Sequence, residues 1–338
     1  MISIGEEGYI IAEIAQAHDG SLGTCFAYAK SAKKIGCDAI KFQLHIAEEE
    51  SLPSEKFRVK TFPQDNSRFE YWERTSFTID QWKSLRDYCN ELGIDFILSP
   101  FSEKALNWCI KLKVNALKIG SGEVSNHLFL KKVANQLDAK IPVFVSSGMS
   151  NYKELGKAFE ILSLNNRLVY PMQCTSKYPT VPKDWGLENI QIMKNKYRTK
   201  IGFSDHSGEI FAPLAAVTLG AEIIETHLVF HKECFGPDTS SSLSLEDMKK
   251  LVDGIRLIKE SMSYSYNKDI YNEEILDMKR LFEKKIVARK NIKKDEKFNS
   301  DNITAKKGCK TGINAQYSFQ IIGKKAKRDY SKNEPIDG

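Results

Sequence analysis

The sequence predicts an α/β fold of the (β/α)8 barrel class, followed by a small β-rich C-terminal domain. Eight short apolar runs recur along the first two-thirds of the chain, and segments with helical periodicity separate most of them. Eight such units over roughly 250 residues are typical of this TIM-barrel architecture. The turn after the first run, residues 16–20, has no GxGxxG pattern. A doubly wound dinucleotide-binding sheet is therefore disfavoured.

The runs expected to form barrel strands are short and almost continuously apolar, as strands buried on both faces should be. They are Tyr9–Ala15, Ala39–Leu44, Asp95–Phe101, Ala116–Ser121, Pro142–Gly148, Leu168–Cys174, Thr199–Asp205 and Ile223–Val229. Apolar residues at helical spacing predict the helices between them. These are Leu22–Ile35, Asp80–Leu92, Glu103–Leu112, Glu154–Leu164 and Ser244–Glu260.

The domain boundaries follow from shifts in composition. The barrel is expected over residues 1–260, a polar linker over 261–280 and the β-rich domain over 281–338. In that last domain the expected strands are Lys285–Ala288, Asn302–Ala305 and Phe319–Lys324. So short a domain is marginal alone and should dock on another surface. The longest insertion in the barrel, Ala47–Thr78, mixes aromatic and charged residues and predicts a lid, an interface or a packed surface excursion.

The composition excludes several classes of protein. Hydrophobic residues make up 41% and aromatic residues 10% of the 338 residues, which is ordinary for a globular protein. The formal charge of +6 is small for a nucleic-acid-binding protein. No apolar run approaches the roughly 18–20 residues of a membrane span, and the N-terminus lacks the basic region of a signal peptide. The seven scattered cysteines form no CxxC pair, so we expect a cytoplasmic protein that binds neither nucleic acid nor membrane.

Two lysines stand inside predicted barrel strands, where an unpaired ammonium is costly. One interpretation of Lys41 and Lys118 is a buried ion pair with Glu13 or Glu123. The other, which we favour, is that both lysines face an anionic ligand at the C-terminal ends of the strands, where a barrel carries its chemistry. Lysine binds phosphate as a point charge.

Hydroxyl groups and a glycine turn stand near these lysines. Ser99 and the turn Gly120-Ser121-Gly122 supply the hydroxyl and backbone N–H groups that a phosphate requires. The two carboxylates Glu13 and Glu123 flank the same region. Either one can accept a proton, orient a water molecule or neutralise a lysine.

Two histidines occupy matching positions on the seventh and eighth predicted strands. His206 and His227 should therefore come within reach of one ion, and two imidazoles with an acidic neighbour suit a divalent metal. Three other histidines lie away from the strand ends or on flanking turns and are expected on the surface: His45, His127 and His231.

The motifs that hold these residues resemble those of the N-acetylneuraminate (sialic acid) synthases and, more broadly, the nonulosonic acid synthases. They occur in the family's order: IAEI at 11–14, KFQ at 41–43, SPF at 99–101, KIGSGE at 118–123, SSGM at 146–149, CTSKYP at 174–179, GFSDHS at 202–207, ETH at 225–227 and GPD at 236–238. The tail resembles the family's SAF (antifreeze-like) domain. Its matching pieces are IVARKNIKKDEKF at 286–298, DNITAKK at 301–307 and IIGKKAKRD at 321–329.

The resemblance implies that phosphoenolpyruvate is condensed with an N-acylated hexosamine, such as N-acetylmannosamine or a diacetamido sugar. The products are a nine-carbon α-keto acid and phosphate. The residues implied to hold phosphoenolpyruvate are Lys41, Ser99, Lys118, Ser121, Ser176 and Ser204. Manganese or magnesium would lie on His206 and His227. The residues implied to serve the sugar and the chemistry are Glu13, Gln43, Glu123, Tyr178 and Asp238. In this family the SAF domain caps the partner's barrel in a swapped homodimer.

Two departures from the family pattern concern substrate contacts. Ser176 stands where the family has asparagine, and Lys307 stands where the SAF domain has the arginine that reads the N-acyl group. Lysine cannot reproduce a bidentate guanidinium contact. The resemblance therefore leaves the identity of the sugar open.

Two alternative functions remain. A Schiff-base aldolase or lyase would use Lys118 or Lys41 as its nucleophile and would need no metal. A carbohydrate-binding or assembly protein with a degenerate barrel would have lost at least one of the polar residues at the strand ends. All of those residues are present.

Overall fold

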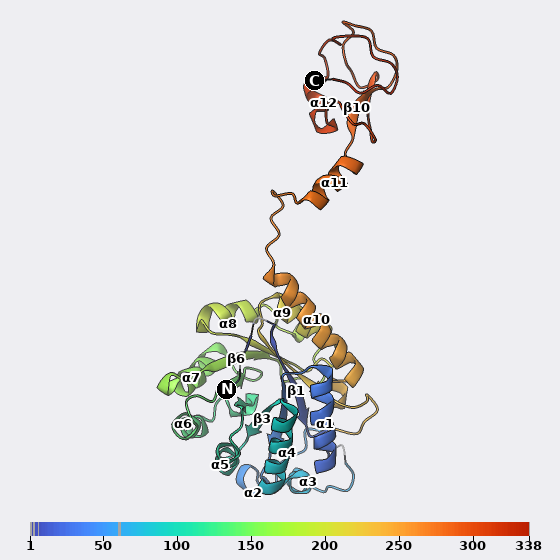
Figure 1. Ribbon diagram of the computed structural model, residues 1–338. Coiled ribbons are helices and arrows are strands. Elements are labelled where there is room, and N and C mark those ends of the chain that lie inside the picture. Colours follow the sequence, from blue (N-terminus) through green and yellow to red (C-terminus); the bar gives the residue numbers. More distant parts are fainter. Residues whose placement is uncertain (1, 3, 6, 60–61, 338) are drawn as a thin grey trace. The chain divides into compact units, whose positions relative to one another are not determined.

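The computed structural model describes residues 2, 4–5, 7–59 and 62–337, and its chain divides into two compact units, Met1–Tyr264 and Ser265–Gly338 (Figure 1). Among these described residues, no helix combines the length and the apolar character that crossing a membrane requires. All seven cysteines are free thiols.

The first unit is a closed barrel of eight parallel strands, as the sequence predicts. Each strand pairs with the next in chain order, and β1 pairs with β8 to close the ring. A short ninth strand follows beside β8. The strands are β1 Tyr9–Ala15, β2 Ala39–Leu44, β3 Asp95–Pro100, β4 Ala116–Ile119, β5 Val143–Ser146, β6 Val169–Cys174, β7 Gly202–Asp205, β8 Ile223–Leu228 and β9 Ser242–Leu243. All eight predicted runs contain a barrel strand.

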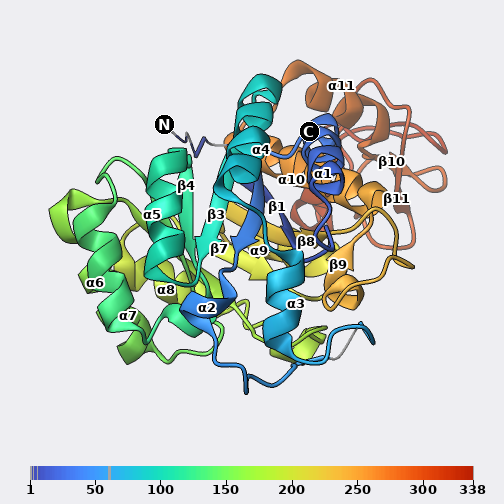
Figure 2. The ribbon, with the colours of Figure 1, turned by 90° about the horizontal axis from the view of Figure 1, so that it is seen from below.

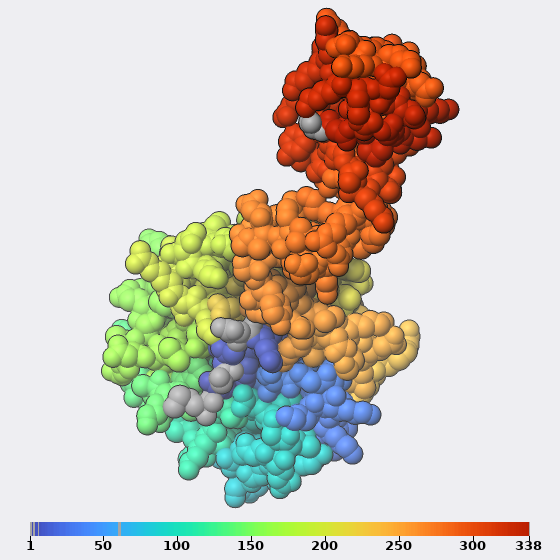
Figure 3. Space-filling view, turned by 45° about the horizontal axis from the view of Figure 1, so that its top comes forward, coloured from blue at the N-terminus to red at the C-terminus, as the bar shows by residue number. Residues whose placement is uncertain are grey.

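Helices surround the barrel (Figure 2). They are α1 Leu22–Ile35, α2 Ala47–Glu50, α3 Arg68–Thr75, α4 Ile79–Leu92, α5 Glu103–Leu112, α6 His127–Gln136, α7 Tyr152–Leu162, α8 Asn189–Tyr197, α9 Phe211–Thr218 and α10 Leu245–Ser263. Local signals fix several ends. Thr78 and Gln81 form a capping box at the start of α4, and Gly93 ends that helix in the left-handed conformation. Helices α1 and α10 pack side by side, which joins the two ends of the barrel sequence. In the space-filling view, blue and orange segments of the first unit lie next to each other (Figure 3).

The barrel interior consists of layers, because alternate strand residues point inward. The lower layer is apolar and includes Ile11, Ala39 and Ile97. Two positions further along the same strands are Glu13, Lys41 and Ser99, and all three are buried. The alternation of the strands therefore carries polar side chains into the next layer, toward the C-terminal ends.

The insertion between β2 and α4 has a small core of its own. Phe62, Tyr71 and Trp72 pack together with Ala47. Residues 60 and 61 of the insertion lie outside the described residues. The remainder of the insertion lies over the C-terminal end of the barrel, where it lines the cavity described below.

The second unit contains α11 Glu273–Phe282, the antiparallel pair β10 Lys285–Ala288 and β11 Ile303–Lys306, and α12 Ser318–Ile321. It has a separate apolar core that includes Ile286, Ile292 and Tyr330. Within the range predicted as linker, α10 continues to Ser263 and α11 begins at Glu273.

The strand predicted at Phe319–Lys324 is wrong, because this segment begins in α12 and turns at Gly323. Ile321 enters the core, whereas Phe319 is 88% exposed and Ile322 is 43% exposed. One buried side chain in three apolar positions matches a short helical turn and not the alternation of a strand.

Candidate active site

Four charged side chains form a buried cluster inside the barrel, each at most 4% exposed. Lys118 Nζ donates to both carboxylate oxygens of Glu225, at 2.7 and 2.8 Å. Lys41 Nζ lies 2.7 Å from Glu13 Oε2 and 3.7 Å from Glu225 Oε1. The ion pair of Lys41 with Glu13, which was the less favoured interpretation of the sequence, is therefore present. Lys118 pairs with Glu225 and not with Glu13 or Glu123. Two ammonium groups and two carboxylates balance within the cluster.

Glu225 is the anion that both lysines share, and no role was predicted for it from the sequence. Burial raises the pKa of a carboxyl group, but Lys118 and Lys41 outweigh burial here and lower the pKa of Glu225 to about 2. Burial raises the pKa of Glu13 against the opposing effect of Lys41, and burial lowers the pKa of Lys118. The position of Glu225 in the sequence could have identified it as a site residue. It stands two residues before His227 on one predicted strand, and therefore on the same face of that strand.

Hydroxyl groups extend this cluster, as the sequence predicts. Lys41 Nζ donates to Ser99 Oγ at 3.3 Å, and Ser204 Oγ donates to Glu225 Oε1 at 3.1 Å. Both serines are buried. An anion that entered this layer would meet two ammonium groups and two hydroxyl groups.

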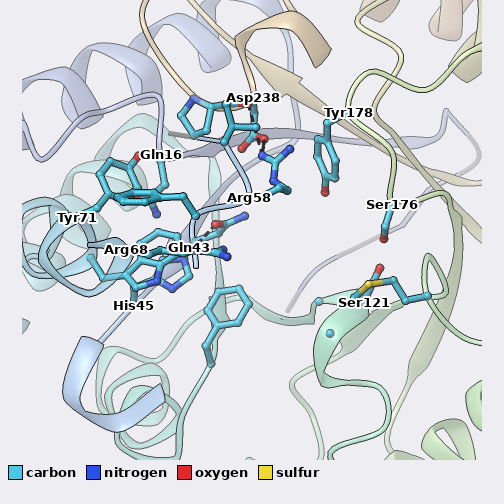
Figure 4. Close-up of a pocket in the computed structure, with 18 of the residues that line it drawn as sticks. Gln16, Gln43, His45, Arg58, Arg68, Tyr71, Ser121, Ser176, Tyr178 and Asp238 are labelled. Atoms are coloured by element: carbon cyan, nitrogen blue, oxygen red, sulfur yellow. Dashed lines mark hydrogen bonds and ion pairs between the residues drawn. The ribbon is translucent and has the colours of Figure 1, made fainter. Parts of the chain in front are cut away.

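Ser121 and Ser176 lie near each other in the wall of the cavity (Figure 4), and both hydroxyl groups are close to Gly148. The Gly148 N–H donates to Ser121 Oγ at 3.1 Å. A Cβ at this position would come within 2.7 Å of Ser121 Oγ, and it would also clash with Ser176 Oγ. Any larger residue than glycine would fill the space between the two hydroxyl groups.

His206 and His227 lie together, as their matching positions predict. Their ring centroids are 5.3 Å apart, and both side chains are buried. Burial lowers the pKa of His227 to about 3, so its ring is neutral and keeps a nitrogen lone pair. His206 Nδ1 lies 2.8 Å from the carbonyl oxygen of Thr175, which leaves Nε2 for another partner. Tyr178 stacks on His206 with a centroid distance of 4.1 Å.

These two imidazoles suit a metal that also takes ligands from substrate or water. Among the residues that the structure describes, no group of three or more His, Cys, Asp or Glu side chains is placed to hold an ion. Burial opposes a charge on His206, but Cys174 and the Thr175 carbonyl outweigh burial and raise its pKa to about 9. A metal ion would compete with that proton.

A cavity of about 350 Å³ opens above this layer. Its lining comes from the strand ends, the insertion and the loop after β8, and it includes Gln43, Ser121, Ser176, Tyr178 and Asp238. The insertion adds Arg58, which pairs with Asp238 and lies over the Tyr178 ring at 4.4 Å (Figure 4). Arg58 was not predicted as a site residue, because it stands in a segment without periodicity.

His45 also lines this cavity, so its predicted surface position is wrong. Its side chain is 8% exposed and lies between the rings of Trp72 and Phe101. The ring contacts Gln43, whose amide donates to Glu13 Oε1 at 3.0 Å. Trp72 comes from the insertion, and that packing is invisible in the local sequence. His127 and His231 are exposed, as predicted.

Two predicted site residues have partners that do not belong to this cluster. Glu123 accepts a hydrogen bond from Asn126 and contacts neither buried lysine, and burial raises the pKa of its carboxyl. Lys307 belongs to the second unit, where it is exposed and its ammonium lies 4.7 Å from the centroid of the Phe282 ring.

Comparisons with known proteins agree with this geometry. The model of the NeuB family matches residues 28–267. The chain is 32% identical to a pseudaminic acid synthase of Campylobacter jejuni, over 95% of this chain and 93% of that protein. It is also 32% identical to an N,N'-diacetyllegionaminic acid synthase of the same species, over 97% and 98%. A crystal structure of N-acetylneuraminic acid synthetase from Leptospira borgpetersenii, in complex with citrate, superposes with a TM-score of 0.70 and 28% identity, over 81% of this chain and 92% of that one.

Proposed function

Because this chain belongs to the NeuB family, we propose that it is a nonulosonic acid synthase. It condenses phosphoenolpyruvate with an N-acylated hexosamine and releases phosphate and a nine-carbon α-keto acid. The observation that carries this proposal is the buried cluster of Lys41, Lys118, Glu13 and Glu225 beneath an open cavity. The test is a phosphate-release screen with phosphoenolpyruvate, manganese and a panel of N-acyl hexosamines that includes 2,4-diacetamido sugars. Reactions without sugar give the background.

Phosphoenolpyruvate binds at the buried lysines in this proposal. In the free protein, Lys41 and Lys118 form ion pairs with Glu13 and Glu225. When phosphoenolpyruvate binds, its phosphate and carboxylate groups interact with the same two ammonium groups. The hydroxyl groups that complete this subsite are those of Ser99, Ser121, Ser176 and Ser204. Preorganised cations and hydroxyls stabilise the charge that develops on the departing phosphate.

We expect Lys118→Met to weaken phosphoenolpyruvate binding by about 10- to 100-fold, since a hydrogen bond to a charged group contributes roughly 1.5–3 kcal/mol. Affinity for the sugar should change little. Titration calorimetry with each substrate checks this prediction. Lys177→Met is the matched control, because Lys177 is 58% exposed and pairs with Asp184 outside the cluster. Unchanged phosphoenolpyruvate affinity in Lys118→Met and also in Lys41→Met would contradict the assignment.

The metal belongs to the proposal as well. His206 and His227 would hold manganese or magnesium, and the neutral ring of His227 and the free Nε2 of His206 fit that role. When bound, the ion supplies a Lewis acid for the aldehyde of the open-chain sugar. Asp238 and Tyr178 border the same cavity and position the sugar hydroxyl groups.

Glu13 acts on water in this scheme. Its carboxylate is held by Lys41 at 2.7 Å and by Gln43 at 3.0 Å. From that fixed position it orients the water molecule that attacks the oxocarbenium carbon after carbon–carbon bond formation, and it accepts the proton that this water releases. Glu123 pairs with Asn126 instead, and the role in sugar binding that the family resemblance implies for it stays a prediction.

The second unit completes the proposal. We assign residues 281–338 to a SAF domain that caps the barrel of the partner chain in a homodimer, with Lys307 directed at the sugar. Its exposed apolar side chains, Phe319 and Ile322, favour such docking. The free thiols and the use of phosphoenolpyruvate support a cytoplasmic location.

Subunit mixing tests capping by the partner. A chain that ends at Tyr264 retains the barrel unit but should be inactive. When it exchanges subunits with a full-length His206→Ala chain, we expect partial recovery, because one heterodimer site combines an intact barrel with an intact cap. Capping within one chain predicts no recovery. Absence of activity in heterodimers that are demonstrably formed would contradict the swapped arrangement.

A Schiff-base aldolase is the second candidate, and one observation favours it. Burial lowers the pKa of Lys118, which increases the fraction of the side chain in the neutral, nucleophilic amine form. Borohydride reduction in the presence of a keto acid separates the two candidates. Covalent trapping on Lys118 would support the aldolase, whereas chelator inactivation without trapping supports the synthase.

A further inference from the structure

A continuous set of hydrogen bonds leads from the insertion to the catalytic carboxylate. Glu50 Oε1 lies 2.6 Å from His45 Nδ1, and His45 Nε2 lies 3.1 Å from Gln43 Oε1. Gln43 Nε2 donates to Glu13 Oε1 at 3.0 Å. Glu50 ends the short helix α2, and the other two side chains stand at the C-terminal end of β2 and just beyond it.

The charge on Glu13 determines the direction of these bonds. An ionised Glu13 balances the cluster, because Lys41 and Lys118 then face two carboxylates. The carboxylate accepts only, so Gln43 must turn its NH2 group toward Glu13 and its oxygen toward His45. His45 Nε2 therefore faces an acceptor and must carry a proton.

The contact of the other ring nitrogen, Nδ1, leads to the same conclusion independently. His45 Nδ1 faces the carboxylate of Glu50, which is also an acceptor. Both nitrogens of the ring must donate, and only the imidazolium has two N–H groups. A neutral His45 would place a lone pair against either the Glu50 carboxylate or the Gln43 oxygen.

The surroundings of His45 favour a cation. The ring lies between Trp72, at a centroid distance of 3.7 Å and an interplanar angle of 15°, and Phe101, at 4.4 Å and 6°. A cation between two aromatic faces is stabilised by their quadrupoles. The Glu50 side chain is 7% exposed, and its Oε2 has no hydrogen-bond partner among the described residues, so this buried carboxylate needs a nearby positive charge.

Other ionisable groups near the ring come from several elements. Glu123 lies close enough to Glu50 for their charges to interact, and Arg68 lies over the Trp72 ring at 5.0 Å. Burial, together with the charge of His45, lowers the pKa of the nearby His18 to about 3, so His18 is neutral. The charged group in direct contact with the His45 ring is thus the Glu50 carboxylate.

We propose that His45 is a positioning residue for Glu13: as an imidazolium held by Glu50, it fixes the amide of Gln43 so that its NH2 group points at the Glu13 carboxylate. The proposal rests on the function proposed above for Glu13. It gives the insertion a catalytic purpose, because Trp72 and Glu50 together hold the imidazolium in place. Loss of the Nε2 proton allows the amide to rotate and removes a hydrogen bond from the carboxylate that orients water.

The protonation state of His45 can be measured without turnover. In full-length protein labelled with 15N-histidine, the two ring nitrogen shifts distinguish an imidazolium from either neutral tautomer. We expect an imidazolium for His45 at neutral pH and a neutral ring in Glu50→Gln. The spectrum of His45→Gln assigns the signals by their disappearance. A neutral His45 ring in the wild-type protein would overturn the proposal, whether or not the chain is a synthase.

Two substitutions of His45 separate positioning from packing. The amide nitrogen of His45→Gln lies near the position of Nε2 and can still donate to Gln43, whereas the shorter side chain of His45→Asn cannot reach it. Both lose the stacked ring. We expect kcat for phosphate release to fall about 5- to 10-fold further in His45→Asn than in His45→Gln, as one hydrogen bond contributes roughly 1–1.4 kcal/mol. The KM values for phosphoenolpyruvate should be alike.

Equal kcat values in the two variants, at equal melting temperatures, would overturn the positioning role. If either variant fails to fold, Glu50→Gln decides the question, because it retains both rings and the shape of the contact. The ring nitrogen shifts of Glu50→Gln also show which nitrogen of the neutral ring keeps its proton. A kcat loss with a ring that lacks the Nε2 proton, or an unchanged kcat with a ring that keeps it, supports the proposal. An unchanged kcat without the Nε2 proton, or a kcat loss with it, contradicts the proposal. An inactive wild-type protein with an imidazolium at His45 would refute the proposed function of Glu13 and leave the hydrogen-bond set intact.

Discussion

Replacement of His206 or His227 by alanine is expected to reduce phosphate release by more than about 100-fold. Loss of a partner that merely orients a metal ligand already costs about 10–100-fold, so loss of a ligand should cost more. The described residues offer these two imidazoles and no third His, Cys, Asp or Glu in the same group, so each variant would retain a single protein ligand. Steady-state assays with added manganese or magnesium measure the effect.

Chelation provides the complementary experiment. Exhaustive treatment of the wild-type protein with EDTA should abolish activity, and either metal ion should restore it. His127→Ala is the control for the substitution itself, because His127 is exposed at the start of α6 and lines no part of the cavity. Full activity after verified removal of divalent ions would refute the metal proposal while leaving the lysine subsite untouched.

Glu225→Gln is expected to lower the free energy of unfolding by about 3–5 kcal/mol, the usual cost of removing one partner from a buried ion pair. The substitution keeps the shape of the side chain but leaves Lys118 and Lys41 with one carboxylate between them. Denaturant unfolding of the two proteins under identical conditions measures the difference. A change below about 1 kcal/mol, the value of an exposed pair, would show that the cluster is hydrated and not buried.

Glu160→Gln is the matched control, because Glu160 is 69% exposed and pairs with Lys157 on the surface of α7. It should leave the melting temperature unchanged.

The pH dependence of stability adds a second check on Glu225. The pKa of Glu225 is depressed in the folded protein to about 2, so its contribution is present above the unfolded value near 4.3 and is lost as the pH falls toward 2. The stability difference between wild type and Glu225→Gln should narrow over that range.

The candidate site shows where inference from sequence ends. Lys41, Lys118, His206 and His227 were identifiable because each departs from a continuous apolar pattern at a strand end. Glu225 departs from the pattern in the same way, but its role depends on the closure of the ring, which brings β8 opposite β4. Partners 107 residues apart cannot be matched by local patterns.

Glu123 and His45 show the same limit of prediction from sequence. Glu123 was predicted beside the lysines and lies elsewhere, whereas His45 was predicted on the surface and is buried. The motif that carries Glu123 indicated a place beside the lysines, yet the turn at 121–123 directs its carboxylate to Asn126. His45 stands one residue beyond β2, where a surface position was a reasonable prediction. Its burial depends on Trp72 and Phe101, which arrive from the insertion and from the end of β3.

The sequence by itself determined the barrel, its strand order and the identity of most polar groups in the interior. It could do so because strand alternation and helical periodicity are local consequences of backbone geometry. The tertiary structure decided which carboxylate neutralises which lysine, which side chains of the insertion enter the cavity and how Gln43 is oriented toward Glu13. Those outcomes depend on distances between segments remote in the chain, and electrostatic and hydrogen-bond energies fall steeply with distance.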